Sequence, residues 1–210
     1  MVNYFFYCSF IFQFENKMIL QQKFSSYHII LASNSPRRKQ FLTDLGLTFT
    51  VQPANVNEEY PAELRGKDIA LFIAEQKASA FTEVGENELV ITCDTIVWLD
   101  HTAFGKPYDK AEAVEMLQQL SGKTHEVISA VCLKSTGKNH LFYDITQVTF
   151  NSLRPEDIAY YVEQYKPFDK AGAYGIQEWI GLIGIEKIEG SYTNVVGMPM
   201  EKLYNELMKW

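Results

Sequence analysis

The sequence predicts an α/β protein with a mixed sheet, and three observations lead to this class. Segments with helical periodicity and segments with strand periodicity alternate along the 210 residues, as they do in α/β folds. The run LVITCDTIVWL at 89–99 is long, apolar and rich in β-branched residues, as in a buried central strand. The turn TGKN separates two further strand-like runs, and this arrangement is typical of a hairpin.

The first half of the chain should form three strands and two helices. Ser35 and Pro36 have the pattern of an N-cap followed by the first helical residue, and Gly46 ends that helix. In order, the expected elements are a strand at 27–32, a helix at 36–45, a strand at 47–51, a helix at about 67–82 and the strand at 89–99.

The second half continues the alternation without a linker between domains. Asp109 caps a helix that extends to about Gly122, and Glu112 is its capping-box partner. The remaining expected elements are strands at 125–135 and 140–150, a helix at 155–166, a small-residue loop at 168–177, a strand near 180–188, a turn at EGSYTN and a final helix from Pro199.

Composition and charge narrow the class of partner. Apolar residues make up 47% of the chain and charged residues 21%, which is typical of a globular protein. The net charge of −7 argues against a nucleic acid polymer, whereas a small anionic substrate needs only a local basic pocket. No run approaches 18 apolar residues, so no membrane span is expected. Cys8, Cys93 and Cys132 show neither metal-ligand nor disulfide spacing, which indicates a reducing cytoplasm.

The N-terminal segment is rich in aromatic residues. It has neither the basic start nor the small-residue cleavage site of a signal peptide. A second methionine, Met18, lies closer to the first convincing strand. We therefore expect residues 1–17 to be a non-essential extension.

Three cations lie at the start of the helix at 36–45, which is the unfavourable end for positive charge. Arg37, Arg38 and Lys39 fall in its first turn, where the helix dipole is positive and each cation costs up to about 1 kcal/mol. Exposure to solvent would keep this cost small. Alternatively, the free backbone N–H groups and the guanidinium groups converge on a phosphate. The stretch alone leaves both interpretations open.

Two charged residues interrupt segments that should be buried. Lys77 falls within the apolar stripe of the helix at 67–82, so it either snorkels to water or points into a cleft as a phosphate ligand. Asp94 interrupts the central strand, where an isolated carboxylate is costly unless it is paired, protonated or bound to metal. A structural hydrogen-bonded role and a catalytic or metal-binding role both fit Asp94.

Acidic residues in NVNEEYP could complete a metal site. Glu58 and Glu59 are adjacent, and with Asp94 they could supply the hard oxygen ligands that Mg²⁺ or Mn²⁺ prefers. Lys106 lies in the turn FGKPYDK, and it matters only if this turn faces the same cleft.

Common signatures of other catalytic sites are missing from the sequence. There is no P-loop, HExxH or GxSxG motif, and no convincing GxGxxG motif after a strand. The four histidines show no metal-ligand spacing, so we expect each to be structural or solvated. A hydrolase with a serine nucleophile is therefore unsupported.

Eight motifs occur in the order of one known family. They are LASNSPRR, VNE, AEQKA, CDTIV, GKP, LSGKTHEV, DKAGAYGIQ and GSYTNVVGMP. From residue 28 onward the sequence resembles the Maf-type nucleoside triphosphate pyrophosphatases. The resemblance implies a single catalytic domain at 28–210, with two lobes around a central cleft, and leaves 1–27 as an N-terminal extension. It also implies hydrolysis of nucleoside triphosphates to the monophosphate and pyrophosphate, Mg²⁺ or Mn²⁺ as cofactor, and a possible homodimer.

The resemblance assigns roles to individual residues. Asp94 matches the family's catalytic aspartate, the proton acceptor, and Glu58 matches its glutamate, although Glu59 would take that place after a one-residue slip. Glu58 and Asp94 would hold the metal ion, and Lys77 joins them as a catalytic residue. The substrate-binding residues implied are Ser33, Ser35, Arg37, Arg38 and Lys106.

The sequence looks like the family branch that acts on dTTP and UTP rather than the branch that acts on 7-methyl-GTP. In that branch the base is selected by residues that correspond to Arg37, Thr95 and Gln177. A glutamine amide offers both a donor and an acceptor, as does the edge of uracil or thymine. Glu178 and Trp179 replace the glycine that usually follows this glutamine in the family, which affects the expected base preference or loop mobility more than the chemistry.

Two other functions fit parts of this pattern. The family is also linked with arrest of cell division, so one alternative is a nucleotide-binding regulator whose hydrolysis is incidental. Such a regulator needs the basic pocket but not the carboxylates, and the combination of Glu58, Asp94 and Lys77 favours the enzyme. The other alternative is a phosphatase that releases inorganic phosphate, which product analysis distinguishes from a pyrophosphatase.

Overall fold

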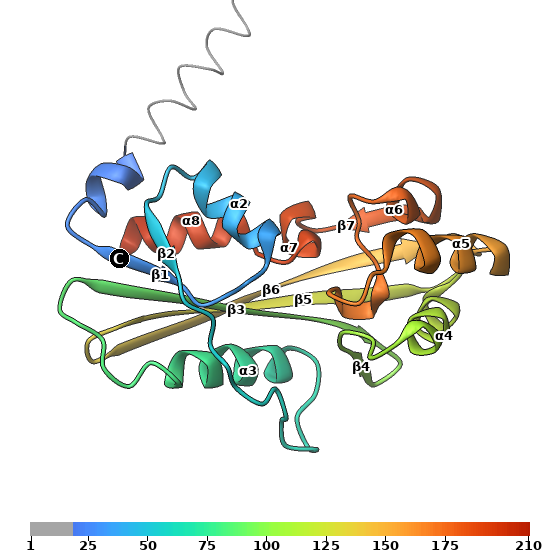
Figure 1. Cartoon of the computed structure of the whole chain (residues 1–210), viewed down its shortest axis with the longest axis horizontal. Coiled ribbons are helices and arrows are strands. Elements are labelled where there is room, and N and C mark those ends of the chain that lie inside the picture. The colour runs from blue at the N-terminus through green and yellow to red at the C-terminus, as the bar shows by residue number, and fades with distance from the viewer. Residues whose placement is uncertain (1–18) are drawn as a thin grey trace, which may run out of the picture.

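A seven-stranded mixed sheet forms the centre of the computed structural model, which describes residues 19–210 (Figure 1). The strands are β1 His28–Leu31, β2 Phe49–Val51, β3 Glu88–Leu99, β4 Thr102–Phe104, β5 Thr124–Ser135, β6 Lys138–Phe150 and β7 Ile185–Glu189. Their order is β2-β1-β3-β5-β6-β7, and β4 pairs with β3 outside this path. β1 is parallel to β2 and β3, whereas the other pairs are antiparallel. The predicted α/β class with a mixed sheet is confirmed.

Helices cover both faces of this sheet. They are α2 Pro36–Asp44, α3 Lys67–Ser79, α4 Lys110–Leu120, α5 Pro155–Tyr165, α6 Trp179–Gly184, α7 Tyr192–Val196 and α8 Met200–Lys209, with a 3₁₀ turn at Ala171–Ala173. In Figure 1, α3 lies below the sheet, α2, α7 and α8 lie above it, and α4 and α5 lie at its far end. Within residues 19–210, no helix is long and apolar enough to cross a membrane.

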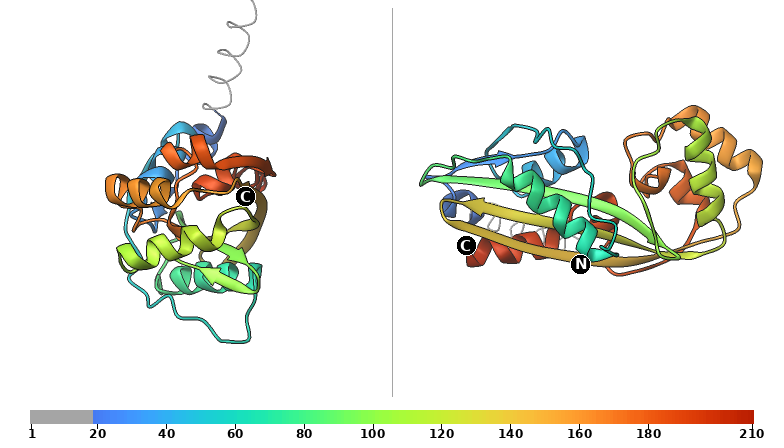
Figure 2. Two further views of the ribbon diagram at one scale, coloured as in Figure 1. Left: turned by 90° about the vertical axis from the view of Figure 1, so that its right-hand side faces the viewer. Right: turned by 90° about the horizontal axis from the view of Figure 1, so that it is seen from below.

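Three long strands connect two lobes. β3, β5 and β6 contain 12, 12 and 13 residues, so each extends about 40 Å at the usual rise of a strand. One end carries β1, β2, α2, α3 and α8 and is called the α3 lobe; the other carries α4, α5, α6 and β7 and is called the α5 lobe (Figure 2). Leu31 and Leu203 belong to the apolar cluster of the first lobe, and Phe150 and Tyr161 belong to that of the second.

The helix start signals read from the sequence are present. Ser35 is the N-cap of α2 and accepts a hydrogen bond from Arg38 N. Asp109 is the N-cap of α4 and accepts one from Glu112 N at 2.9 Å. The return bond of this capping box differs from the prediction, because the Glu112 carboxylate accepts from Tyr108 N, one residue before the cap.

Three segments differ from the predicted elements. The strand expected near 180–188 is a helix over 179–184, followed by β7, because a short apolar run does not distinguish a helix from a strand. Gly181 allows the turn of this helix to lie against the Ile176 carbonyl, where a Cβ would be only 1.9 Å from the oxygen. The predicted turn EGSYTN contains the start of α7, and the short strand β4 was not predicted.

The packed part of the chain begins before the first strand. Residues 19–23 are helical, and Leu20 and Phe24 are 0% and 5% exposed within the apolar cluster that includes α8. Lys23 also donates a hydrogen bond from Nζ to the Met208 carbonyl. Residues 19–27 therefore pack as part of the α3 lobe, while residues 1–17, the expected non-essential extension, lie outside the described residues.

A buried histidine lies in the core of the α5 lobe. His125 is 2% exposed, and its Nε2 is 2.7 Å from the hydroxyl of Tyr174. No hydrogen-bond partner among the described residues contacts its Nδ1. Burial lowers the pKa of His125 to about 4 from the ordinary value of 6.5, so the ring is neutral at pH 7.

This burial should make the protein less stable in acid. The unfolded chain takes up a proton at His125 below pH 6.5, whereas the folded chain does so only near pH 4. The contribution of neutral burial is therefore complete above pH 6.5 and is lost as the pH falls towards 4, with a total on the order of 3 kcal/mol.

Urea unfolding of the wild type and of a His125→Gln variant between pH 7 and pH 4 measures this contribution. We expect the free energy of unfolding to fall less steeply with decreasing pH in the variant, because glutamine does not titrate. Equal slopes would contradict the assignment of a neutral buried ring to His125.

Candidate active site

One cavity of about 410 Å³ is lined by residues of both lobes. Its wall includes the start of α2 from the α3 lobe and the segment around 169–177 from the α5 lobe. The structure brings together every predicted site residue at this wall: Ser33, Ser35, Arg37, Arg38, Glu58, Lys77, Asp94, Thr95, Lys106 and Gln177. Glu58 lines the cavity, whereas Glu59, the alternative that a one-residue slip would give, does not.

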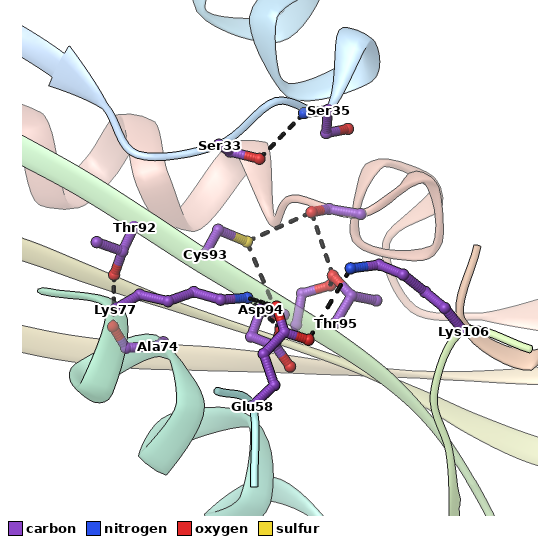
Figure 3. A network of polar contacts seen from close by, with 12 residues as sticks. Ser33, Ser35, Glu58, Ala74, Lys77, Thr92, Cys93, Asp94, Thr95 and Lys106 are labelled. Carbon is purple, nitrogen blue, oxygen red and sulfur yellow. Dashed lines mark hydrogen bonds and ion pairs between the residues drawn. The ribbon is translucent and has the colours of Figure 1, made fainter. Parts of the chain in front are cut away.

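Lys77 contacts two carboxylates at the centre of this wall (Figure 3). It lies in the last turn of α3, and its Nζ is 2.7 Å from Asp94 Oδ1 and 2.9 Å from Glu58 Oε1. Lys77 and Asp94 are only 7% and 6% exposed. The lysine in the apolar stripe therefore points into the cavity, and the carboxylate in the central strand is paired.

The charges of this cluster stabilise one another. Burial opposes the charged form of Lys77, but Asp94 and Glu58 outweigh burial and raise its pKa. Burial likewise opposes the charged form of Glu58, but the nearby Lys77 ammonium outweighs it and the pKa of Glu58 falls. Within residues 19–210, no hydrogen-bond donor contacts the second oxygen of Asp94, Oδ2. That oxygen is able to accept a proton from a ligand or a water molecule.

Loops from both lobes add polar groups around this cluster. Lys106 follows β4, and its Nζ is 3.9 Å from Glu58 Oε2, so the turn that contains it does face the cavity (Figure 3). On the opposite wall, Ser33 Oγ accepts a hydrogen bond from Ser35 N at 3.2 Å. Ser35 then starts α2, so the N-terminus of that helix also lies at the wall.

The Arg38 guanidinium donates its hydrogen bonds to other groups of the protein. Its Nε donates to Gly197 O at 2.9 Å, and its Nη1 donates to Cys93 O at 2.7 Å. The guanidinium also donates to the hydroxyls of Ser33 and Thr95, at 3.3 and 3.1 Å. Four of its five N–H groups are used in this way. Arg38 therefore connects α2 to β3 and to the loop before α8. These hydrogen bonds offset the unfavourable free energy of a cation at a helix N-terminus.

Arg37 is placed differently, although it is the next residue along the helix. Its Nη1 is 3.0 Å from Asp169 Oδ2, and this ion pair connects the α3 lobe to the α5 lobe beside the cavity. Asp169 is 54% exposed, so the pair is accessible to solvent and to a ligand. Arg37 is thus the more available of the two arginines for binding an anion.

Two of the residues expected to select the base lie in different environments. Thr95 Oγ1 is 2.9 Å from Ser129 Oγ and donates to Gly197 O at 3.3 Å, in addition to accepting from Arg38. Gln177 is exposed and lies in a turn at the cavity wall. Thr95 is therefore fixed by the protein, whereas Gln177 has its amide available for a ligand.

Glu178 and Trp179 do not line the cavity. The Glu178 carboxylate accepts a hydrogen bond from the Tyr161 hydroxyl and lies 3.0 Å from Lys170 Nζ. The Trp179 ring packs edge-on against Tyr160, with ring centroids 5.0 Å apart. The added charge and ring therefore face away from the space beside Gln177.

Asp169, Lys170 and Tyr174 also line the cavity, and none of them was predicted as a site residue. They lie in the segment FDKAGAYGIQ, which was interpreted as a small-residue loop and, within the family motif DKAGAYGIQ, was assigned a role only at Gln177. Lys170 is 8% exposed although it lies outside any helix or long strand. The signal available in the sequence was an Asp-Lys pair that directly precedes several small residues.

The donor set at the cavity fits a cation that arrives with a phosphorylated ligand. No group of three or more His, Cys, Asp or Glu side chains in the described part of the chain forms a metal cluster. Glu58 and Asp94 do converge on one point, the Lys77 ammonium. Mg²⁺ is usually held by one or two carboxylates together with substrate phosphates rather than by a complete protein cage. Two adjacent carboxylates therefore fit such an ion.

The fold and the cavity define a class of protein that binds and processes phosphorylated ligands. Cations, a helix N-terminus and the buried carboxylate of Asp94 surround one space between two lobes of an α/β fold, and such combinations are typical of active sites. A family model described as "Maf-like protein" matches residues 28–210. The chain belongs to the Maf family, and the resemblance read from its motifs is confirmed.

Relatives named for an enzymatic activity match most of the chain. A dTTP/UTP pyrophosphatase of Flavobacterium psychrophilum is 53% identical over 191 residues, which cover 90% of this chain and 98% of the relative. A dTTP/UTP pyrophosphatase of Bacteroides fragilis is 52% identical over 183 residues, which cover 86% of this chain and 95% of the relative.

Because the two arginines make different contacts, substituting them should lower the free energy of unfolding by different amounts. We expect Arg38→Lys to lower the free energy of unfolding by about 3 kcal/mol, because lysine cannot replace hydrogen bonds to two buried carbonyls and two hydroxyls. Arg37→Lys should change it by less than about 1 kcal/mol, because an exposed ion pair contributes little. Urea unfolding of both variants provides the comparison, and similar losses in the two would contradict the structural role of Arg38.

Proposed function

We infer that this chain is a nucleoside triphosphate pyrophosphatase that hydrolyses dTTP and UTP to the monophosphate and pyrophosphate. Relatives about half identical to it carry that activity in their names and match over most of the chain. The single structural observation that supports the inference best is the Lys77 ammonium held between Asp94 and Glu58 at the wall of a cavity. A buried, paired carboxylate with one free oxygen is suited to proton transfer.

The cations around the cavity would bind the triphosphate. In this proposal the charged side chains of Arg37 and Lys106 approach from the two lobes, while Ser33, Ser35 and the N-terminal amides of α2 supply hydrogen bonds. Arg38 has one N–H group left and contributes mainly by fixing Ser33. The ion pairs that Arg37 and Lys106 make in this structure, with Asp169 and Glu58, would be exchanged for contacts with phosphate.

Asp94 is the proposed general base. Its free oxygen would accept a proton from a water molecule that attacks the α-phosphorus. Lys77 holds the other oxygen in place and stabilises negative charge that develops on the phosphates. Glu58 in turn pairs with the same ammonium and helps to orient Lys77.

Glu58 and Asp94 would also hold a divalent cation, Mg²⁺ or Mn²⁺, which enters with the nucleotide. When bound, such an ion neutralises phosphate charge and favours departure of pyrophosphate. Lys77 outweighs the effect of burial and lowers the pKa of Glu58, so this carboxylate does not need to lose a proton before it binds the ion.

The base would be selected at the α5 lobe side of the cavity. Gln177 can offer one donor and one acceptor to the edge of uracil or thymine. Arg37 lies across the same cavity, and Thr95 is held in place by Ser129 and Arg38. Modified pyrimidine triphosphates that keep this edge are also candidate substrates.

Several expectations from the sequence complete the proposal. The catalytic domain, placed at 28–210 from the sequence, would also include residues 19–27, because these pack in the α3 lobe. Residues 1–17 would be dispensable for activity. Cys93 and Cys132 are free and buried, in keeping with a cytoplasmic protein. A homodimer and a role in cell division are further proposals that the family resemblance raises.

A nucleotide-binding regulator with incidental hydrolysis is the alternative function. A regulator requires only the cations that bind phosphate, whereas this chain buries Asp94 and Lys77 as a pair at the cavity wall. Burying such a pair costs desolvation free energy. This cost is better explained by chemistry at the site than by binding alone.

A panel of triphosphates tests the proposed function. Purified protein with Mg²⁺ or Mn²⁺ would be incubated with dTTP, UTP, CTP and 7-methyl-GTP, and nucleotide products, pyrophosphate and phosphate would be quantified. We expect monophosphate and pyrophosphate, formed chiefly from dTTP and UTP. Release of inorganic phosphate would indicate a phosphatase, and tight binding without hydrolysis would indicate the regulator.

The role of Asp94 predicts a large loss of turnover in the Asp94→Asn variant. Loss of a general base typically lowers kcat by about 100-fold to 10,000-fold. Asp144→Asn is the matched control, because Asp144 is a strand aspartate paired with Lys202 at 2.7 Å outside the cavity. Near-normal turnover in a folded Asp94→Asn protein would rule out Asp94 as the base.

A further inference from the structure

The turn that carries Gln177 is held by groups that the proposed chemistry does not use. Glu178 N donates to Gly175 O at 3.0 Å, which closes the turn around Ile176 and Gln177. The hydroxyl of Tyr161, a fully buried residue of α5, accepts from Gly175 N at 3.0 Å and donates to Glu178 Oε2. One hydroxyl therefore binds both ends of the turn.

The Glu178 carboxylate fits closely against the backbone of this turn. A Cβ added at Gly175 would lie 2.9 Å from Glu178 Cδ and Oε2 and 3.0 Å from Lys170 Cε. Such distances are shorter than van der Waals contact, so a Cβ here would displace the ends of the Glu178 and Lys170 side chains. The turn, Glu178 and Lys170 are thus packed as one unit.

The same carboxylate is linked to Arg37 through a row of charges that alternate in sign. Lys170 Nζ is 3.0 Å from Glu178 Oε1 and 2.6 Å from Asp169 Oδ1. The other oxygen of Asp169, Oδ2, is 3.0 Å from Arg37 Nη1. Burial alone would raise the pKa of Asp169, but the hydrogen bonds and charges of Lys170 and Arg37 outweigh it and lower that pKa.

We propose that Glu178 is a positioning residue that fixes the turn of Gln177 for recognition of the pyrimidine base. The proposal rests on the proposed function, in which Gln177 contacts the base. Glu178 itself does not line the cavity, so it acts through Tyr161 at one oxygen and through Lys170 at the other. A turn that is ordered before the ligand arrives does not lose further conformational freedom when it binds.

The proposal separates base selection from chemistry. Lys77 forms its ion pairs with Asp94 and Glu58, whereas Glu178 and Asp169 both pair with Lys170. The two groups of side chains therefore share no ion pair. Removing Glu178 should therefore change the affinity for the preferred base and leave the chemical step nearly unchanged. A purely structural role would instead lower the active fraction for all nucleotides alike.

Steady-state kinetics with UTP and CTP provide the test. We expect Glu178→Ala to raise KM for UTP about tenfold, the size of one lost hydrogen bond, with kcat changed by less than about threefold. The value of kcat/KM for CTP should stay nearly constant, so the UTP-to-CTP ratio falls. Tyr161→Phe should move the ratio in the same direction, because it removes only the hydroxyl that binds the turn.

Glu163→Gln is the matched control. Glu163 also lies on α5 and pairs with a lysine, Lys110, but both side chains are more than half exposed and outside the cavity. This variant should keep the UTP-to-CTP ratio of the wild type. Thermal unfolding identifies variants that are not folded, and Glu178→Gln, which keeps the shape but loses the charge, replaces Glu178→Ala if the latter is unfolded.

Binding measurements keep the test independent of turnover. UTP and CTP would be titrated by calorimetry into Asp94→Asn protein, with and without Glu178→Ala, and we expect the preference for UTP to fall about tenfold. An unchanged ratio in folded Glu178 and Tyr161 variants would overturn the proposal. If Gln177→Ala also left the ratio unchanged, the assignment of Gln177 to base selection in the proposed function would fail as well, which separates the two failures.

Discussion

The buried contact between Lys77 and Asp94 is the interaction on which the rest of the site depends. Neither charge could remain buried without the other, because an unpaired ion in the interior is strongly destabilising. The contact therefore requires that α3 packs on β3 with its last turn beside the middle of that strand. Glu58 completes the cluster from the segment between β2 and α3, so three distant parts of the chain meet at one ammonium group.

Positive charge around the cavity serves two distinct purposes. Arg38 donates most of its hydrogen bonds to other groups of the protein. These bonds join α2 to β3 and to Gly197, which precedes α8. Arg37 and Lys106 extend from opposite lobes, and each is paired with a carboxylate in a contact that an anion could replace. The helix N-terminus at Ser35 adds an attraction for anions that does not depend on any single side chain.

Much of this arrangement could be predicted from the sequence, and the remainder depends on contacts between distant residues. Asp94 was identifiable because a carboxylate inside an apolar strand needs a partner, and Lys77 because it interrupts an apolar helical stripe. The structural role of Arg38 was not, because its acceptors include a carbonyl 159 residues away. α6 was predicted as part of a strand, because its short apolar run fits both structures. Lys170 was missed because it lies in a loop, where neither helical nor strand periodicity indicates which side chains are buried. The sequence therefore does not show that its ammonium contacts both Asp169 and Glu178.

The direction of water attack tests the central claim most directly, namely that Asp94 and Lys77 promote hydrolysis at the α-phosphorus. UTP would be hydrolysed in water enriched in ¹⁸O, and the label would be located in the products by mass spectrometry. This account predicts that the label enters uridine monophosphate and that the pyrophosphate is unlabelled. Label in pyrophosphate, or labelled inorganic phosphate as the first product, would contradict it.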